Sequence, residues 1–187
     1  MKLLVAAALF AGFFARSADA QVPVGPGAVK MGKVQVEVVS TPEYQLSSGP
    51  KKRSESKQWL EVEVEFDTVP PMIDELTFKY TIMIGKSLLD GEVTHVNIPQ
   101  QKSHFSVVYV SPSAIARLTG GKPLNAGNVE NIWVDVSKSG QKLAQTVTLK
   151  ASAMPNLPHL SGMVLNKMET PFAPLFYDRY PAIRAGR

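Results

Sequence analysis

The sequence of 187 residues contains no cysteine. A chain without cysteine has no disulfide bond, no thiolate to bind zinc and no thiol nucleophile. It also lacks the cysteine to which a lipoprotein's lipid is attached after signal-peptide cleavage. Its stability must therefore come from the burial of apolar side chains, and its length suits one domain with a substantial core.

Local catalytic motifs are missing as well. The sequence has no GxSxG, no P-loop, no Rossmann fingerprint and no HExxH, so we predict no catalytic residue, no metal ligand set and no cofactor. His95, His104 and His159 are the only histidines, and their expected place is the surface or a loop. Two alternatives stay open: a metal site where adjacent strands bring His95 and His104 together, and a Ser-His-Asp triad built from distant positions.

Neither sign of charge dominates. Twenty Lys and Arg stand against sixteen Asp and Glu, giving a formal net charge of +4, and this balance does not favour nucleic acid as a partner. The basic run Lys51-Lys52-Arg53 lies in a polar stretch over residues 47–57, where we expect an exposed loop. Contact of this run with an acidic surface is the alternative.

A long apolar run occurs only near the N-terminus. Residues 3–15 are apolar, follow a basic start, and precede the small-x-small sequence Ala18-Asp19-Ala20. This pattern predicts a signal peptide over residues 1–20, with an N-terminal anchor as the alternative. The run is shorter than the roughly 20 residues that a membrane-spanning helix needs. We therefore expect an exported chain without a transmembrane segment after cleavage, located in the periplasm, at the outer membrane or on the cell surface.

Alternation of period two dominates the middle of the chain and predicts strands. After a flexible leader over residues 21–32, we expect a domain over residues 33–151 with seven strands and one short helix at residues 111–119. The expected strands cover residues 33–40, 58–67, 76–84, 92–98, 104–110, 131–137 and 142–150. This order predicts an all-β fold, an antiparallel immunoglobulin-like sandwich.

Several polar and aromatic side chains fall on the outer faces of these strands. Glu61, Glu63 and Glu65 alternate with the apolar set of their strand, and we expect a solvated row matched by lysines of neighbouring strands. Trp59 and Trp133 also oppose the aliphatic set of their strands. Outward tryptophans can anchor an interface or stack on sugars; the alternatives are a wrong assignment of faces and a cover formed by the tail.

Residues 152–187 form an extension rich in proline and aromatic residues. The prolines exclude a long regular element, yet the segment is too aromatic for an ordinary disordered tail. Three alternatives remain open: packing across its own sandwich, docking onto a partner or a second copy, and disorder. The residues that we predict to bind a partner are Trp59, Trp133, Phe172, Phe176, Tyr177 and Tyr180.

Three stretches carry a family resemblance: QWLEVEVEF at 58–66, FKYTI at 78–82 and NIWVDV at 131–136. Between the signal peptide and the aromatic tail, they resemble a secreted protein of mucin-degrading Verrucomicrobia of the Akkermansia type. That family is associated with a type IV pilus-like gene cluster and the outer membrane. The resemblance implies an immunoglobulin-like fold and a role in pilus assembly or at the cell surface, and it transfers no catalytic or metal residue.

Three functions therefore compete. The first is a non-enzymatic structural or interaction protein, an accessory component of a pilus-like or cell-surface assembly, whose exposed edge strands accept partner strands. Its partners would be other pilus or envelope proteins or a second copy. The second is a glycan-binding module that uses exposed aromatic rings, and the third is an exported hydrolase.

Overall fold

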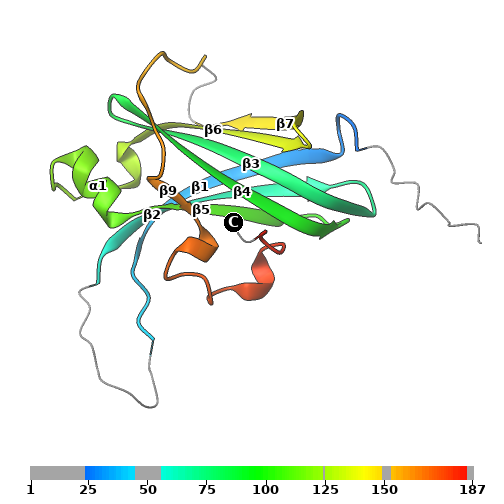
Figure 1. Ribbon diagram of the computed structural model, residues 1–187, viewed down its shortest axis with the longest axis horizontal. Coiled ribbons are helices and arrows are strands. Elements are labelled where there is room, and N and C mark those ends of the chain that lie inside the picture. The colour runs from blue at the N-terminus through cyan, green and yellow to red at the C-terminus, as the bar shows by residue number, and fades with distance from the viewer. Residues whose placement is uncertain (1–23, 45–55, 124, 149–152, 185–187) are drawn as a thin grey trace, which may run out of the picture.

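The computed structural model describes residues 24–44, 56–123, 125–148 and 153–184 (Figure 1). The predicted signal peptide and the basic run Lys51-Lys52-Arg53 lie outside these residues. Two sheets pack face to face. Sheet A has the order β1 (Val29–Ser40), β2 (Gln58–Thr68), β5 (His104–Val110) and β9 (Val164–Asn166). Sheet B has the order β7 (Gln141–Val147), β6 (Val129–Lys138), β3 (Met72–Ile84), β4 (Ser87–Pro99) and β8 (His159–Leu160).

The strand order confirms the predicted immunoglobulin-like sandwich. All neighbouring strands are antiparallel except β4 and β8, which are parallel. The series β1, β2, β5 matches strands A, B and E of an immunoglobulin domain, and β7, β6, β3 matches strands G, F and C. β9 takes the place beside β5 that strand D occupies in that fold. It follows all the other strands in the sequence, so a late segment of the chain completes a sheet that earlier strands begin.

The alternating side chains fill the space between the sheets. The inward residues of β2 and β3 are fully buried, and no disulfide is needed to join the layers. They comprise Leu60, Val62, Val64, Phe66, Leu76, Phe78, Tyr80 and Ile82. The interior is close-packed, with the Phe66 and Phe78 rings 4.7 Å apart between centroids. Burial of this apolar surface is the main source of stability for the chain.

The α-helix found among the described residues has clear local causes. α1 (Pro112–Thr119) begins after Ser111, whose hydroxyl accepts a hydrogen bond from the Ala114 amide at 3.2 Å. It ends at Gly120, where φ of 64° requires the left-handed conformation that glycine adopts without strain. Among the described residues, no helix has the length and apolar character needed to cross a membrane.

The strand bounds differ from the sequence-based prediction inside the domain and at its two ends. β3 begins four residues earlier than predicted, at Met72, and β4 begins five residues earlier, at Ser87. β1 begins at Val29, inside the stretch predicted as a flexible leader, because Val29 pairs with Thr68 and is buried. The predicted extension over residues 152–187 also contributes β8 and β9 and the short 3-10 turns η2 (Lys167–Glu169) and η3 (Tyr177–Arg179). A third such turn, η1 (Ala126–Asn128), precedes β6. The extension is therefore part of the sandwich.

Candidate interaction surface

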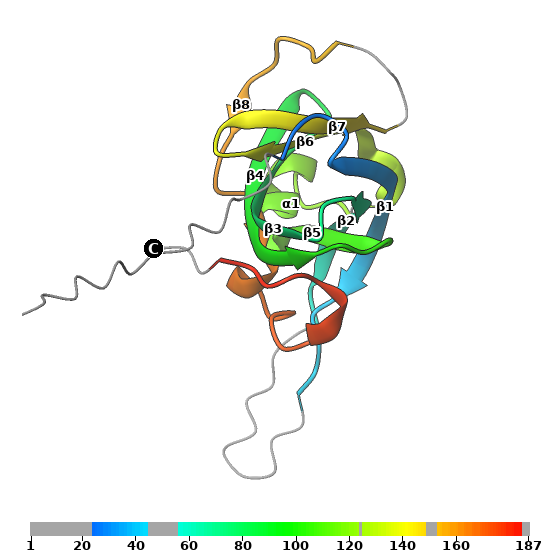
Figure 2. The same ribbon diagram turned by 90° about the vertical axis from the view of Figure 1, so that its right-hand side faces the viewer.

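The C-terminal segment, residues 153–184, runs along one side of the sandwich and then beneath sheet A. It pairs with β4 at His159 and Leu160, and crosses to β5 as β9. It then returns to β4, where Ile183 forms a bridge with His95. In Figure 2 the first part of the segment, with β8, lies at the top beside sheet B, and its later part, coloured orange to red, lies below the strands of sheet A. Of the three alternatives for this segment, the structure shows packing across its own sandwich.

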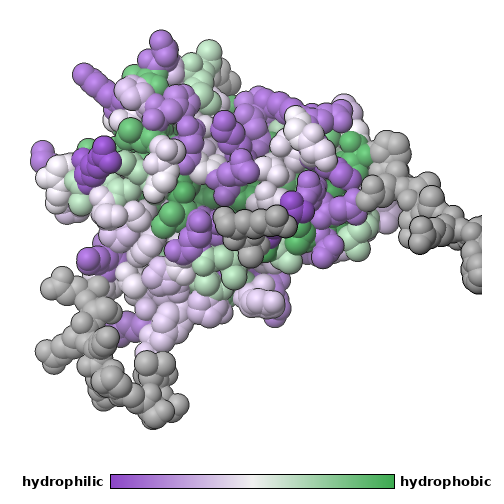
Figure 3. Space-filling view, in the orientation of Figure 1, coloured by the Kyte–Doolittle hydropathy of each residue, from purple (hydrophilic) through white to green (hydrophobic). Residues whose placement is uncertain are grey.

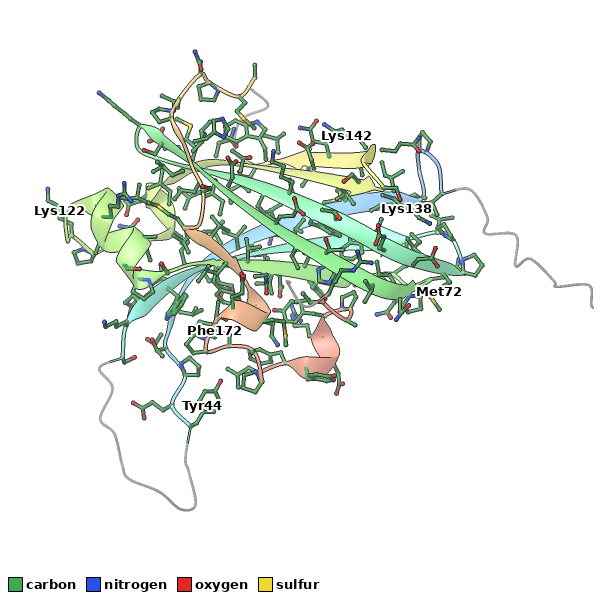
Figure 4. The ribbon with its side chains drawn as sticks, viewed as in Figure 1. Tyr44, Met72, Lys122, Lys138, Lys142 and Phe172 are labelled. Atoms are coloured by element: carbon green, nitrogen blue, oxygen red, sulfur yellow. The ribbon has the colours of Figure 1, made fainter. Side chains whose placement is uncertain are left out.

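A cluster of aromatic rings attaches this segment to the outer face of sheet A. Phe172 stacks on Tyr109 at 4.4 Å between centroids and meets Trp59 edge to face at 5.7 Å. The three residues are 5%, 1% and 8% exposed. Figure 4 shows Phe172 on the segment beside these strands. The predicted outward orientation of Trp59 is correct, but its ring is covered by the tail and presents no free platform.

Glu63 is the polar anchor beneath the segment. Its carboxylate accepts hydrogen bonds from Arg179 Nε at 2.9 Å and Nη2 at 2.5 Å, and from the Tyr180 hydroxyl at 2.7 Å. Arg179 also stacks over the Phe105 ring, 3.8 Å from its centroid. The predicted solvated row is therefore wrong at Glu63, which is 7% exposed and is paired with an arginine of the tail, not with a lysine of a neighbouring strand.

Burial and the Glu63 carboxylate change the pKa values of the ionisable groups around it. The hydrogen bond to Glu63 raises the pKa of Arg179 above its ordinary value, so the guanidinium stays charged. Burial raises the pKa of Tyr180, and hydrogen bonding to Glu63 raises it further. Burial also raises the pKa of Glu61, and the neighbouring carboxylates of Glu63 and Glu37 add to this effect. One arginine thus offsets a locally acidic face of sheet A.

Replacing Arg179 with alanine tests this anchor. The variant leaves the buried Glu63 carboxylate with one hydrogen bond and no cation, and we expect a loss of about 2–4 kcal/mol in the free energy of unfolding. Urea unfolding monitored by tryptophan fluorescence measures it. Arg184→Ala is the matched control because Arg184 pairs with Glu75 while 58% exposed, so we expect a loss below about 1 kcal/mol. Equal losses in the two variants would contradict the anchoring role.

Two of the three histidines are buried, which corrects the prediction that they lie at the surface or in loops. His95 Nδ1 lies 3.0 Å from the Pro181 carbonyl oxygen and therefore donates to it, and Nε2 accepts from the Ser106 hydroxyl at 2.9 Å. The Tyr80 hydroxyl donates to Ser106 at 2.8 Å. Burial lowers the pKa of His95 to about 4. This chain of hydrogen bonds connects the core to the tail.

The other two histidines have separate partners. His104 Nε2 lies 2.9 Å from the Pro99 carbonyl oxygen, and the His104 ring stacks on Phe66. His159 is exposed and pairs with Asp90 at 2.7 Å. Among the described residues, no group of three or more His, Cys, Asp or Glu side chains could hold a metal ion. The Ser106 and His95 pair is enclosed at 0% exposure for both residues, so solvent does not reach it.

The remaining predicted interface residues divide into two groups. Phe176 and Tyr177 lie on the outer side of the segment and are 64% and 80% exposed. Trp133 lies on β6 in sheet B, away from the aromatic cluster, and is only 3% exposed. In Figure 3 the hydrophobic residues of the visible face form small areas among hydrophilic ones. Of the six residues, Phe176 and Tyr177 alone present large exposed rings.

The fold and this surface define a class: an immunoglobulin-like sandwich whose C-terminal segment covers the edges of β4 and β5. The chain matches a protein-family model over residues 20–187 and belongs to that family. Among solved structures, it is similar to a crystal structure of a protein from Akkermansia muciniphila. The identity is 27% and the TM-score 0.73, over 85% of this chain and 94% of that chain. No curated protein matches this chain.

These comparisons confirm part of the resemblance found in the sequence. The likeness to an Akkermansia protein extends over nearly the whole of that protein, and the shared fold is the predicted sandwich. The association with a pilus-like gene cluster stays a prediction.

Proposed function

We propose that this protein is an exported, non-enzymatic interaction module that joins a pilus-like or cell-surface assembly through the free edge of β1. The observation that carries the proposal is the asymmetry of the sheet edges. On one side, the edges of β4 and β5 are paired with β8 and β9. On the other side, β1 pairs with β2 alone and β7 pairs with β6 alone among the described strands. Of these two edges, β1 is the longer, with twelve residues against seven.

The free edge of β1 has the length and composition that strand addition requires. β1 contains twelve residues, of which Val34, Val36 and Val38 are half-buried and Gln35 and Glu37 are exposed. An edge of this kind offers a row of backbone amides and carbonyls to an incoming strand. Lys30 and Lys33 are both exposed near the start of β1. Charged lysines on an edge strand oppose non-specific pairing with the strands of other chains. The module would therefore accept a specific partner strand.

The predicted signal peptide supports a role at the cell envelope, and the family match begins at residue 20, where the signal-peptide cleavage is expected. Two functions compete with this proposal. Glycan binding through Trp59 and Trp133 needs exposed rings on which a sugar can stack, and both rings are buried. A hydrolase built on Ser106 and His95 would need solvent access that the pair lacks.

Hydrogen exchange tests the proposal. In the isolated chain, we expect alternate amides of β1 to exchange rapidly because they point away from β2. Addition of the envelope fraction from the source cells should slow these amides by about tenfold or more, while amides of α1 keep their rates. Binding of envelope proteins without any change in the exchange of β1 would contradict the proposed edge.

A further inference from the structure

A pocket lies within the C-terminal segment, between the turns η2 and η3 and the residues that follow them. Its volume is about 390 Å³, which is the size of many sites for small organic molecules. Its wall is largely apolar and includes Ala173, Pro181 and Ile183. Met168 and Tyr177 also line it and are 55% and 80% exposed. The pocket thus offers apolar surface that a ligand could cover.

Lys167 is the cation among the described residues that line this pocket. The residue is only 3% exposed. Its Nζ donates to the Ala173 carbonyl oxygen at 2.7 Å and lies 5.5 Å from the centroid of the Tyr180 ring. An ammonium group has three donors, yet among the described residues Lys167 forms no ion pair with a carboxylate. A buried cation of this kind is costly unless an anion pairs with it.

The turn that carries Lys167 is fixed by its own hydrogen bonds. The Asn166 amide donates to the Glu169 carboxylate at 2.9 Å, and the Met168 amide donates to the Asn166 side chain at 2.9 Å. The buried Thr170 hydroxyl donates to the Lys167 carbonyl oxygen at 2.7 Å. Burial lowers the pKa of Lys167 below its ordinary value because the ammonium loses contact with water. The cation is therefore already in place, so that binding an anion requires little further ordering.

The charges of the pocket favour a ligand with a single negative charge. Asp178 also lines the pocket, so its formal charge offsets that of Lys167. The neighbouring cation, Arg179, is paired with Glu63. A phosphate carries a charge of about −1.5 to −2 and would need more than one cation, whereas a carboxylate carries one. The apolar wall then requires that the rest of the ligand be apolar as well.

We propose that this pocket binds a small organic acid, with the carboxylate on Lys167 Nζ and an apolar body along Ala173, Pro181 and Ile183. The body of the ligand also covers part of the exposed Met168 and Tyr177 side chains. This site goes beyond the interaction proposed for the edge of β1 and shares no residue with it. Either can therefore fail without the other.

An NMR titration of the purified chain with isotope-labelled lysine side chains tests the site. Octanoate carries one carboxylate on an apolar chain, and octanamide is its neutral counterpart of nearly the same shape. We expect octanoate to shift the Lys167 signal saturably and to bind at least about tenfold more tightly than octanamide. Bound octanoate should also raise the pKa of Lys167, because a nearby negative charge favours the protonated form. Equal affinities of the two probes, or a Lys167 signal that does not move, would overturn the proposal.

Lys167→Met removes the charge and keeps a side chain of similar length. This variant should bind octanoate at least about tenfold more weakly and octanamide as the wild type does. Lys86→Met is the matched control, because Lys86 is exposed and does not line the pocket, and it should leave both affinities unchanged. Undiminished binding of octanoate by Lys167→Met would show that the site lies elsewhere. If that variant does not fold, the titration of Lys167 in the wild-type chain decides: a pKa that octanoate leaves unchanged contradicts the site.

Discussion

Gly91→Ala is expected to lower the free energy of unfolding by about 3 kcal/mol, at the upper end of what overpacking costs. The added methyl group would lie 2.3 Å from Cγ1 and 2.6 Å from Cβ of Val164. Because Val164 belongs to β9, relief of the clash must displace the segment from the edge of β5. The loss is measured by urea unfolding, and displacement by the increased exposure of Trp59 to a fluorescence quencher.

A double-mutant cycle isolates this contact. Val164→Gly removes both atoms that the new methyl group would meet, so Gly91→Ala should cost little in that background. The two substitutions should therefore be strongly non-additive. Additive losses would show that Gly91 is required for a reason other than the approach of β9.

Acidification from pH 6.5 to about 4 is the second large expected effect. The pKa of His95 falls to about 4 in the folded chain because its ring is buried, whereas an unfolded histidine titrates near 6.5. Between pH 6.5 and 4, His95 is protonated in the unfolded chain but stays neutral in the folded chain. Stability is thus fully present above pH 6.5 and falls by about 1.4 kcal/mol per pH unit below it, in total by on the order of 3 kcal/mol.

A variant without the His95 ring separates the contribution of His95 to the pH dependence of stability from that of other groups. Glu61 acts in the opposite direction: its pKa is raised in the folded chain, so its protonation stabilises the fold. The comparison is therefore made between wild type and His95→Gln, whose unfolding free energy should lose the slope between pH 6.5 and 4. If the variant does not fold, an NMR titration of His95 in the wild type gives the same answer. If the unfolding free energies of wild type and His95→Gln changed in parallel with pH, or if His95 were protonated near pH 6.5, the enclosed chain of hydrogen bonds would be contradicted.

The main strands were predictable because their side chains alternate. β2 reads apolar and charged in turn from Leu60 to Phe66, and the strand covers Gln58–Thr68. The same logic could have located His95, because it lies in phase with Leu89 and Val93, which are buried on β4. A histidine was expected at the surface because of its polarity, whereas the periodicity pointed to the interior.

The C-terminal strands and the anchor were not predictable by the same means. β8 and β9 contain two and three residues, too few for any alternation to be recognised. Glu63 looked solvated because nothing within its own strand covers it; Arg179 lies 116 positions away in the sequence. Long-range pairing of this kind depends on the path of the tail, and local pattern carries no information on that path.

The central claim is that the module engages its partners on the side of β1 while its own tail covers the opposite side. Lysine cross-linking in intact envelopes, followed by mass spectrometry, tests it most directly. Lys30 and Lys33 on β1 and Lys142 on β7 should supply the cross-links to other proteins, whereas Lys86, at the turn between β3 and β4, should supply few. Cross-links concentrated at Lys86 and absent from β1 would contradict the account.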